Sequence, residues 1–336
     1  MKYPPKQTII YYIYPVSAQA GDGGPPKRMR SVRYSKNFII IMLIVLTCML
    51  LPGCGTGTET TASAAAGSGG FKAPEFKSAE FSEDSAEGNG EVQVDLSHKA
   101  DGYISLKADS DARLKLQVIK SDKEYIYDIV QGKVQVFPLQ CGNGSYTIKV
   151  MKNVEGSKYF ELYTCTADTE LSSEQAPFLR PNQYADYSKD SKCVKKAAAM
   201  AKSARSEEDF VRQVYEYICK SVKYDKKEAA TVGKGYIPDP DEVMETGKGI
   251  CFDYASLGAS MLRSQGIPAK IIFGYVAPDD LYHAWNMFYT KEGGWKTVEF
   301  KVDPKKWNRI DLTFSANGAN AKFIGDGSNY MDVYEY

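Results

Sequence analysis

The chain has 336 residues, and its 42 basic side chains balance its 42 acidic ones for a formal net charge of zero. A composition of 43% hydrophobic and 25% charged residues suits a chain that buries a core, so wholesale disorder is excluded. A neutral total also argues against a nucleic-acid binder. The charge is unevenly divided: residues 1–53 hold seven basic groups and one acidic group, and residues 54–336 hold 35 and 41, so the two parts carry +6 and −6.

Residues 1–53 are predicted to be an export signal. A basic stretch over residues 27–36 precedes a mainly apolar run of 14 residues, from Phe38 to Leu51. This run is shorter than the roughly 20 apolar residues that span a bilayer, but it has the length of a signal-peptide core. Because Met29 by itself opens a conventional leader, we expect residues 1–28 to come from an upstream start codon.

The motif Leu51-Pro52-Gly53-Cys54, which closes the apolar run, resembles the lipobox of bacterial lipoproteins. The resemblance implies cleavage before Cys54 and a diacylglycerol on its sulfur; the alternative is an uncleaved N-terminal anchor helix. Small residues follow Cys54 and then polar ones, which predicts a flexible tether over residues 54–90. We therefore expect the protein to be lipid-anchored on the extracellular face of the cell membrane.

Residues 91–171 alternate between apolar and polar side chains, as half-buried strands do. Glycines at turn-like intervals separate these runs, at positions 102, 132, 142, 144 and 156. Seven short strands in about 80 residues predict a small all-β, sandwich-like domain. Its histidine, His98, lies at the edge of a predicted strand among charged residues and suggests no chemistry.

A second domain, over residues 185–336, is predicted to be α+β, with helices first and then an antiparallel sheet. Helices are expected over residues 190–204, from the capping box at Ser206 to Val222, and over 250–265. A Gly- and Pro-rich loop is expected over residues 226–249. Strands are expected over residues 270–275, 283–289, 295–302 and 307–312.

The seven cysteines fall into three groups. Cys48 lies in the leader and Cys54 is the candidate for lipidation, whereas Cys251 begins a predicted helix. The other four allow three disulfide pairings among themselves: Cys141, Cys165, Cys193 and Cys219. Reduced, buried thiols are an equally good interpretation, because cysteine is a common core residue.

Cys251 and His283 are the candidates for thiol chemistry. The thiolate is the reactive form, and a helix N-terminus or a cationic histidine lowers the pKa of a thiol. The amide of Cys251, at the start of its helix, is also suited to bind an oxyanion. A third group must orient the imidazole. By spacing alone Glu299 and Asp311 are equal candidates for that role, since each lies four residues after a tryptophan.

Four motifs in the second domain together resemble the transglutaminase-like superfamily. They are Gly249-Ile250-Cys251, Arg263-Ser264-Gln265-Gly266-Ile267-Pro268-Ala269, His283-Ala284-Trp285 and Trp307-Asn308-Arg309-Ile310-Asp311-Leu312-Thr313. The resemblance covers about residues 185–336 and implies a papain-like fold, with Cys251 as nucleophile, His283 as base and Asp311 as orienting acid. It favours Asp311 over the alternative triad acid Glu299, because Lys301 stands where the motif has its threonine.

The expected function is thiol-dependent acyl transfer at the cell surface, through an acyl-enzyme formed on peptide or protein carboxamides. Water as the second substrate gives a peptidase or amidase, and an amine gives a transglutaminase. The alternative is a non-catalytic, envelope-anchored binding or scaffold module. We expect a cell-wall peptide or surface protein as the partner, membrane attachment through the lipid, and no nucleic acid. Metal-binding and nucleotide-binding motifs are absent from the sequence, so no cofactor is expected.

Overall fold

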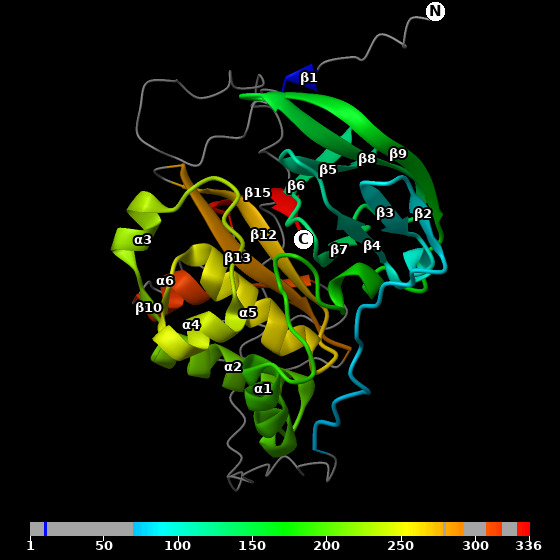
Figure 1. Cartoon of the computed structure of the whole chain (residues 1–336). Coiled ribbons are helices and arrows are strands. Elements are labelled where there is room, and N and C mark those ends of the chain that lie inside the picture. The colour runs from blue at the N-terminus through cyan, green and yellow to red at the C-terminus, as the bar shows by residue number, and fades with distance from the viewer. Residues whose placement is uncertain (1–9, 12–69, 278–279, 292–306, 318–327) are drawn as a thin grey trace, which may run out of the picture. The chain divides into compact units, whose positions relative to one another are not determined.

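The computed structural model describes residues 10–11, 70–277, 280–291, 307–317 and 328–336 (Figure 1). The predicted signal-peptide segment over residues 27–53, Cys54, Glu299 and the strand expected over 295–302 lie outside the described residues, so these predictions stay untested. The described residues belong to one compact unit. The domain boundaries at 91–171 and 185–336 also stay predictions.

Two antiparallel sheets form the N-terminal part of this unit, as the alternating pattern predicts. The first has the order β1-β9-β8-β5-β6: β1 (Ile10–Tyr11), β9 (Lys158–Thr169), β8 (Gly144–Glu155), β5 (Leu114–Lys120) and β6 (Lys123–Asp128). The second has the order β2-β3-β4-β7: β2 (Ala86–Gly88), β3 (Val92–Asp95), β4 (Tyr103–Ala108) and β7 (Val134–Pro138). Alternate apolar residues of both sheets, such as Leu116 and Ile104, are fully buried in one hydrophobic cluster.

Residues 71–90, which the composition assigns to the tether, contact folded elements. The ring of Phe71 stacks on that of Phe210 with 5.2 Å between centroids, and its N–H donates to the carbonyl of Ala204 at 2.9 Å. The ring of Phe76 meets Tyr187 edge-on at 6.0 Å. With β2 also in this stretch, these residues are part of the fold rather than a linker.

The three long helices confirm the helical predictions. They are α1 (Lys192–Ser203), α2 (Glu207–Ser221) and α5 (Cys251–Arg263). The side chain of Ser206 accepts a hydrogen bond from the Asp209 N–H at 3.1 Å, as the capping box requires. Two short 3-10 helices, Lys99–Asp101 and Ala176–Phe178, precede them.

The prediction of a loop over residues 226–249 is wrong. This stretch contains α3 (Lys226–Thr231), α4 (Pro240–Thr246) and β11 (Lys248–Gly249), which pairs in parallel with β10 (Lys223–Tyr224). Asp225 and Asp239 cap the two helices by accepting hydrogen bonds from backbone N–H groups of their first turns. Pro240 occupies the first helical position, where its missing N–H costs nothing.

The C-terminal sheet is antiparallel, with the order β14-β13-β12-β15. Its strands are β14 (Trp307–Ile310), β13 (Leu281–Tyr289), β12 (Ala269–Val276) and β15 (Tyr330–Glu335). The strand expected over 307–312 ends two residues early, because Asp311 is the N-cap of the short helix α6 (Leu312–Ala316). The periodicity analysis did not predict β15.

Helix α5 lies against the C-terminal sheet and is buried from Asp253 to Arg263 (Figure 1). The amide of Asn286, on β13, donates to the carbonyl of Ala255 at 2.9 Å and to that of Lys270 at 3.1 Å. A Cβ at Gly258 would lie 2.6 Å from the Asn286 side chain, so only glycine allows this approach. These contacts hold the helix that begins with Cys251 against the strand that carries His283.

The described cysteines form no disulfide with one another. No helix in the described part of the chain combines the length and apolar character needed to cross a membrane.

Candidate active site

Cys251 is the first residue of α5, and the elements before it determine its position. The parallel pair β10–β11 ends just before the helix, where the N–H of Asp225 donates to the carbonyl of Gly249 at 2.9 Å. The N-cap residue is Ile250, whose N–H donates to Asp253 Oδ2 at 2.7 Å. The half-buried thiol of Cys251 therefore lies at a helix N-terminus whose first turn is closed by a buried carboxylate.

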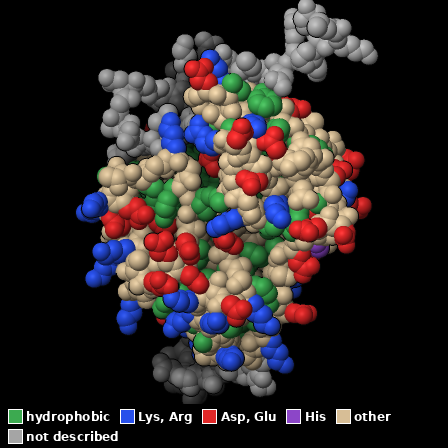
Figure 2. Space-filling model, in the orientation of Figure 1, with side chains coloured by type: hydrophobic (Ala, Val, Ile, Leu, Met, Phe, Trp, Pro, Cys, Tyr) green, Lys and Arg blue, Asp and Glu red, His purple; other side chains and the backbone are tan. Residues whose placement is uncertain are grey.

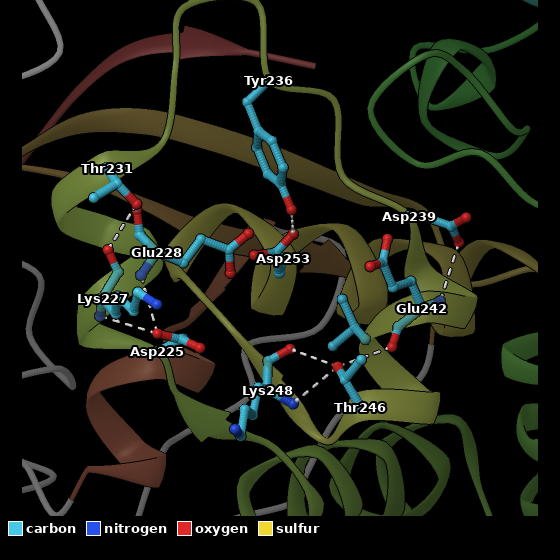
Figure 3. A pocket seen from close by; sticks show the side chains of 11 residues that line it. Asp225, Lys227, Glu228, Thr231, Tyr236, Asp239, Glu242, Thr246, Lys248 and Asp253 are labelled. Carbon is cyan, nitrogen blue, oxygen red and sulfur yellow. Dashed lines mark hydrogen bonds between the residues drawn. The ribbon is translucent and has the colours of Figure 1, made fainter.

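Asp253 also binds the loop between α3 and α4. Figure 3 shows the phenol of Tyr236 directed onto this carboxylate, and its Oη donates to Asp253 Oδ1 at 2.7 Å. Burial raises the pKa of Asp253 to about 6, even though the hydrogen bonds from Tyr236 and Ile250 lower it. A carboxylate at the third helical position is recognisable from sequence as half of a capping box, but its contact with Tyr236 is not.

A pocket of about 430 Å³ lies beside this end of α5, between α3 and α4 (Figure 3). Its lining includes two lysines and five carboxylates, from Asp225, Glu228, Asp239, Glu242 and Asp253. Figure 2 shows Asp and Glu side chains gathered over α3 and α4 on this face. The surface next to the Cys251 turn is therefore mainly acidic.

His283 lies on β13 with its imidazole buried, 3% exposed. Its ring stacks on that of Phe314, with 4.3 Å between centroids and 11° between planes. The ring N–H at Nε2 donates to Asp311 Oδ2, the two atoms being 2.9 Å apart. The Cys251 side chain also interacts with His283 and raises the pKa of its imidazole. The imidazole therefore lies between the thiol and the carboxylate.

The electrostatics of the imidazole follow from these neighbours. Burial lowers the pKa of His283, but the charge of Asp311, its hydrogen bond and the neighbouring Cys251 side chain together raise it to about 10. The imidazolium form is therefore the favoured form of the ring at neutral pH.

Three donors hold the Asp311 carboxylate, which is completely buried. Oδ1 accepts from the N–H of Phe314 at 2.9 Å, the capping bond of α6. Oδ2 accepts from His283 and also from Tyr330 Oη, at 2.9 Å in each case. The carboxylate is thus fixed by its own helix, by β13 and by β15.

Of the residues predicted from sequence, the structure brings Cys251, His283 and Asp311 together. The alternative acid Glu299 and the lipidation candidate Cys54 lie outside the described residues. The sequence reasoning missed Tyr236 and Tyr330, because neither has a local motif that marks its contact with a site residue. Nowhere among the described residues do three or more His, Cys, Asp or Glu side chains gather as metal ligands would.

The raised pKa of His283 predicts a pH-dependent stability, which is best measured in the variant Cys251→Ala, where no thiol titrates beside the ring. In this variant Asp311 still holds the folded pKa of His283 above the ordinary value of 6.5, so the stabilisation is complete below pH 6.5 and is lost as pH rises through the raised folded pKa. Urea unfolding between pH 6.5 and 8.5 should give a free energy that falls by up to about 1.4 kcal/mol per pH unit.

Adding Asp311→Asn to the same variant removes the main cause of the shift and should flatten this dependence. His98 is present in both variants, so its titration cancels in the comparison. Equal slopes in the two variants would contradict the assignment of the raised pKa to Asp311.

A model of the transglutaminase-like superfamily matches residues 194–311, from α1 to Asp311. The matched segment contains Cys251, His283 and Asp311. The part of the chain that carries the site is therefore similar to the transglutaminase-like superfamily, as the sequence motifs imply.

Curated relatives match a shorter stretch. An uncharacterized protein of Mycobacterium leprae is 30% identical over 115 residues, which is 29% of this chain and 37% of the relative. Another from Mycobacterium tuberculosis is 27% identical over 104 residues, 28% of this chain and 31% of the relative. The chain thus spans about a third of the length of these relatives.

Similar solved structures include a protein of Cytophaga hutchinsonii described as a proposed cysteine protease. It is 16% identical, covers 70% of this chain and 83% of its own, and has a TM-score of 0.38. LapG of Legionella pneumophila is 15% identical, with 43% of this chain and 82% of its own covered and a TM-score of 0.30.

Proposed function

We propose that this protein is a cell-surface thiol enzyme that transfers acyl groups from peptide or protein carboxamides, with Cys251, His283 and Asp311 as its catalytic triad. The observation that carries the proposal is the buried contact of 2.9 Å between His283 Nε2 and Asp311 Oδ2, on an imidazole whose pKa the neighbouring Cys251 side chain also raises. A nucleophile, a base within hydrogen-bond reach and an orienting acid are the parts that covalent catalysis requires.

Each member of the triad has a distinct role. Asp311 accepts a hydrogen bond from Nε2–H and so leaves Nδ1 of the ring for the sulfur of Cys251. Because the pKa of His283 is raised to about 10, the ring is cationic at neutral pH. A cation beside the sulfur and a helix N-terminus both stabilise a thiolate, which is the reactive nucleophile.

In the first half-reaction the thiolate attacks the carboxamide carbon, and a C–S bond forms while the carbonyl oxygen becomes an oxyanion. The N–H of Cys251, at the first turn of α5, is available to bind that oxyanion. His283 then donates its proton to the nitrogen of the leaving group as the C–N bond breaks. Ammonia or an amine departs, and a thioester to Cys251 remains.

In the second half-reaction neutral His283 takes a proton from the incoming nucleophile, which attacks the thioester. The C–S bond breaks, and the thiolate–imidazolium pair is restored. Water as the nucleophile releases a carboxylic acid, which is the outcome of a peptidase, amidase or deamidase. An amine releases a new amide, which is the outcome of a transglutaminase.

The location and the substrates are part of the proposal. A signal over residues 1–53 and a lipid on Cys54 would hold the domain outside the membrane, within reach of cell-wall peptides and surface proteins. Residues 54–336 carry a net charge of −6, which disfavours anionic polymers as partners.

Alkylation of Cys251 tests the proposal without a known substrate. The fragment 69–336 should react with iodoacetamide at Cys251 at pH 7, with a rate that falls at least about tenfold in His283→Ala. Mass spectrometry of the labelled peptides gives the rate for each thiol. Cys165 serves as an internal control that should be alkylated slowly, because burial raises the pKa of its thiol to about 12. The control His98→Ala replaces the histidine that lies away from the site and should leave the rate unchanged.

A different result would favour the non-catalytic binding or scaffold module. In that case Cys251 would be labelled no faster than an ordinary free thiol, and His283→Ala would not change its rate. Once fast labelling is established, ammonia release from glutamine peptides, with and without an added primary amine, distinguishes hydrolysis from transamidation.

A further inference from the structure

β15 brings a tyrosine to the triad from outside the segment that matches the family model. Tyr330, the first residue of β15, follows Asp311 by 19 residues, and its Oη donates to Asp311 Oδ2 at 2.9 Å. The same oxygen accepts the ring N–H of His283, also at 2.9 Å. One carboxylate oxygen therefore binds two donors that come from different strands of the sheet.

Close packing of β15 against β12 holds Tyr330 in this place. The two strands pair antiparallel with Val276 opposite Tyr330, and their register shifts between Phe273 and Gly274. A Cβ at Gly274 would lie 2.0 Å from the carbonyl oxygen of Met331, so the glycine is required for this approach. The backbone itself thus directs the start of β15 towards the site.

The ring of Tyr330 is supported on its apolar side. It meets the ring of Trp285 edge-on, with 4.9 Å between centroids and 75° between planes. Trp285 is 1% exposed and forms a small buried cluster with Ile272 and Val276, against which Tyr330 and Phe314 pack. Because the ring is already held, the hydrogen bond from its hydroxyl orders few additional torsions.

We infer that Tyr330 is a positioning residue of the site, which holds Asp311 Oδ2 in place so that the carboxylate keeps the imidazole of His283 oriented. The effect of Tyr330 on catalysis rests on the proposed function, whereas its contact with Asp311 can be tested independently of that function. Without the hydroxyl, Oδ2 loses one of its two donors while it remains buried, and the Asp311 carboxylate is freer to rotate about its last torsion.

The test compares Tyr330→Phe with Tyr334→Phe in the full chain. Tyr334 lies on the same strand and packs on the rings of Tyr125 and Tyr336, so the control removes a β15 hydroxyl without touching Asp311. The first measurement is nitrogen–proton NMR of the imidazoles. The chain has two histidines, and His98 serves as the reference for His283.

In the wild type the Nε2 proton of His283 should be protected from exchange with water. Tyr330→Phe should speed that exchange at least about tenfold and lower the rate of Cys251 alkylation at pH 7 by roughly tenfold. Tyr334→Phe should leave both within twofold of the wild type. Thermal unfolding of both variants reports whether the fold is kept, which is expected because each retains its ring.

An unchanged His283 signal in a folded Tyr330→Phe variant would overturn the inference, whether or not alkylation slows, because the positioning acts through that ring. Equal changes in both variants would also overturn it and would indicate a general role in packing of β15. Failure of the proposed function would be distinguished by the wild type alone, because Cys251 would then react no faster than an ordinary thiol. The NMR comparison would still test whether Tyr330 positions His283.

Discussion

Replacement of Asp311 by asparagine should lower the rate of acyl transfer by roughly 10²–10⁴-fold, as loss of the orienting acid does in other triads, and the rate of Cys251 alkylation at neutral pH by at least about tenfold. The carboxylate accepts a hydrogen bond from Nε2–H of His283 and supplies negative charge that helps to raise the ring's pKa to about 10. An amide has no such charge, and its NH₂ group cannot accept that hydrogen bond. The imidazole then loses both its fixed tautomer and its cationic form.

The substitution should have little effect on the fold. Asp311 is also the N-cap of α6, where its Oδ1 accepts from the N–H of Phe314 at 2.9 Å. Asparagine caps helices about as well as aspartate, so its amide oxygen can keep this bond. A large loss of activity with a melting temperature close to that of the wild type is therefore the expected combination.

Glu299→Gln is the decisive comparison for the identity of the triad acid. It replaces the carboxylate that spacing alone made an equal candidate, and it should leave the alkylation rate within about twofold of the wild type. If instead Glu299→Gln abolishes reactivity and Asp311→Asn does not, the assignment of Asp311 is wrong.

Arg263→Met should be the most destabilising of the substitutions considered, lowering the free energy of unfolding by about 3–5 kcal/mol. The guanidinium is 1% exposed and donates to backbone carbonyls from separate segments of the chain. Its partners are Ala269 O at 2.8 Å, Tyr336 O at 2.8 Å and Arg180 O at 3.2 Å. Methionine has a similar length but no donor, so these acceptors lose their hydrogen bonds.

Burial lowers the pKa of Arg263 to about 10, so the side chain still carries its charge at pH 7. Methionine also removes the cost of burying a charge away from water. The free energy of unfolding should therefore fall by less than the combined contribution of the three hydrogen bonds. Urea unfolding at pH 7 measures the difference. The control is Arg205→Met, on a side chain that is 83% exposed, with an expected change within about 0.5 kcal/mol.

A loss of less than about 1 kcal/mol for Arg263→Met would contradict this account of the arginine in the Arg263–Ala269 motif. It would mean that water or a local rearrangement satisfies the carbonyls. A loss in the expected range identifies this arginine as the residue that joins the end of α5, the start of β12 and Tyr336, which follows β15.

Local sequence patterns were sufficient to predict the long helices. The cap of α2 at Ser206 and the helix that begins at Cys251 can both be read from residue types within a few positions. The short helices α3 and α4 were missed because fewer than two full turns leave little periodicity, even though Asp225, Asp239 and Pro240 are recognisable helix-start signals. The end of β14 was misplaced because Asp311 serves at once as a site residue and as the N-cap of α6.

The sequence by itself determined which residue types carry the chemistry: one histidine in the second domain, one cysteine at a helix start, and two acids that spacing left equal until the family motif favoured Asp311. Only the tertiary structure decided how they interact. The bond from Asp311 to His283, the phenol of Tyr330 on the same oxygen and the raised pKa of the ring all depend on which strands are neighbours and on how far water is excluded. At this site the hydrogen-bond partners, and the residues that bury them, are remote from one another in the chain. No local pattern in the sequence therefore specifies these interactions.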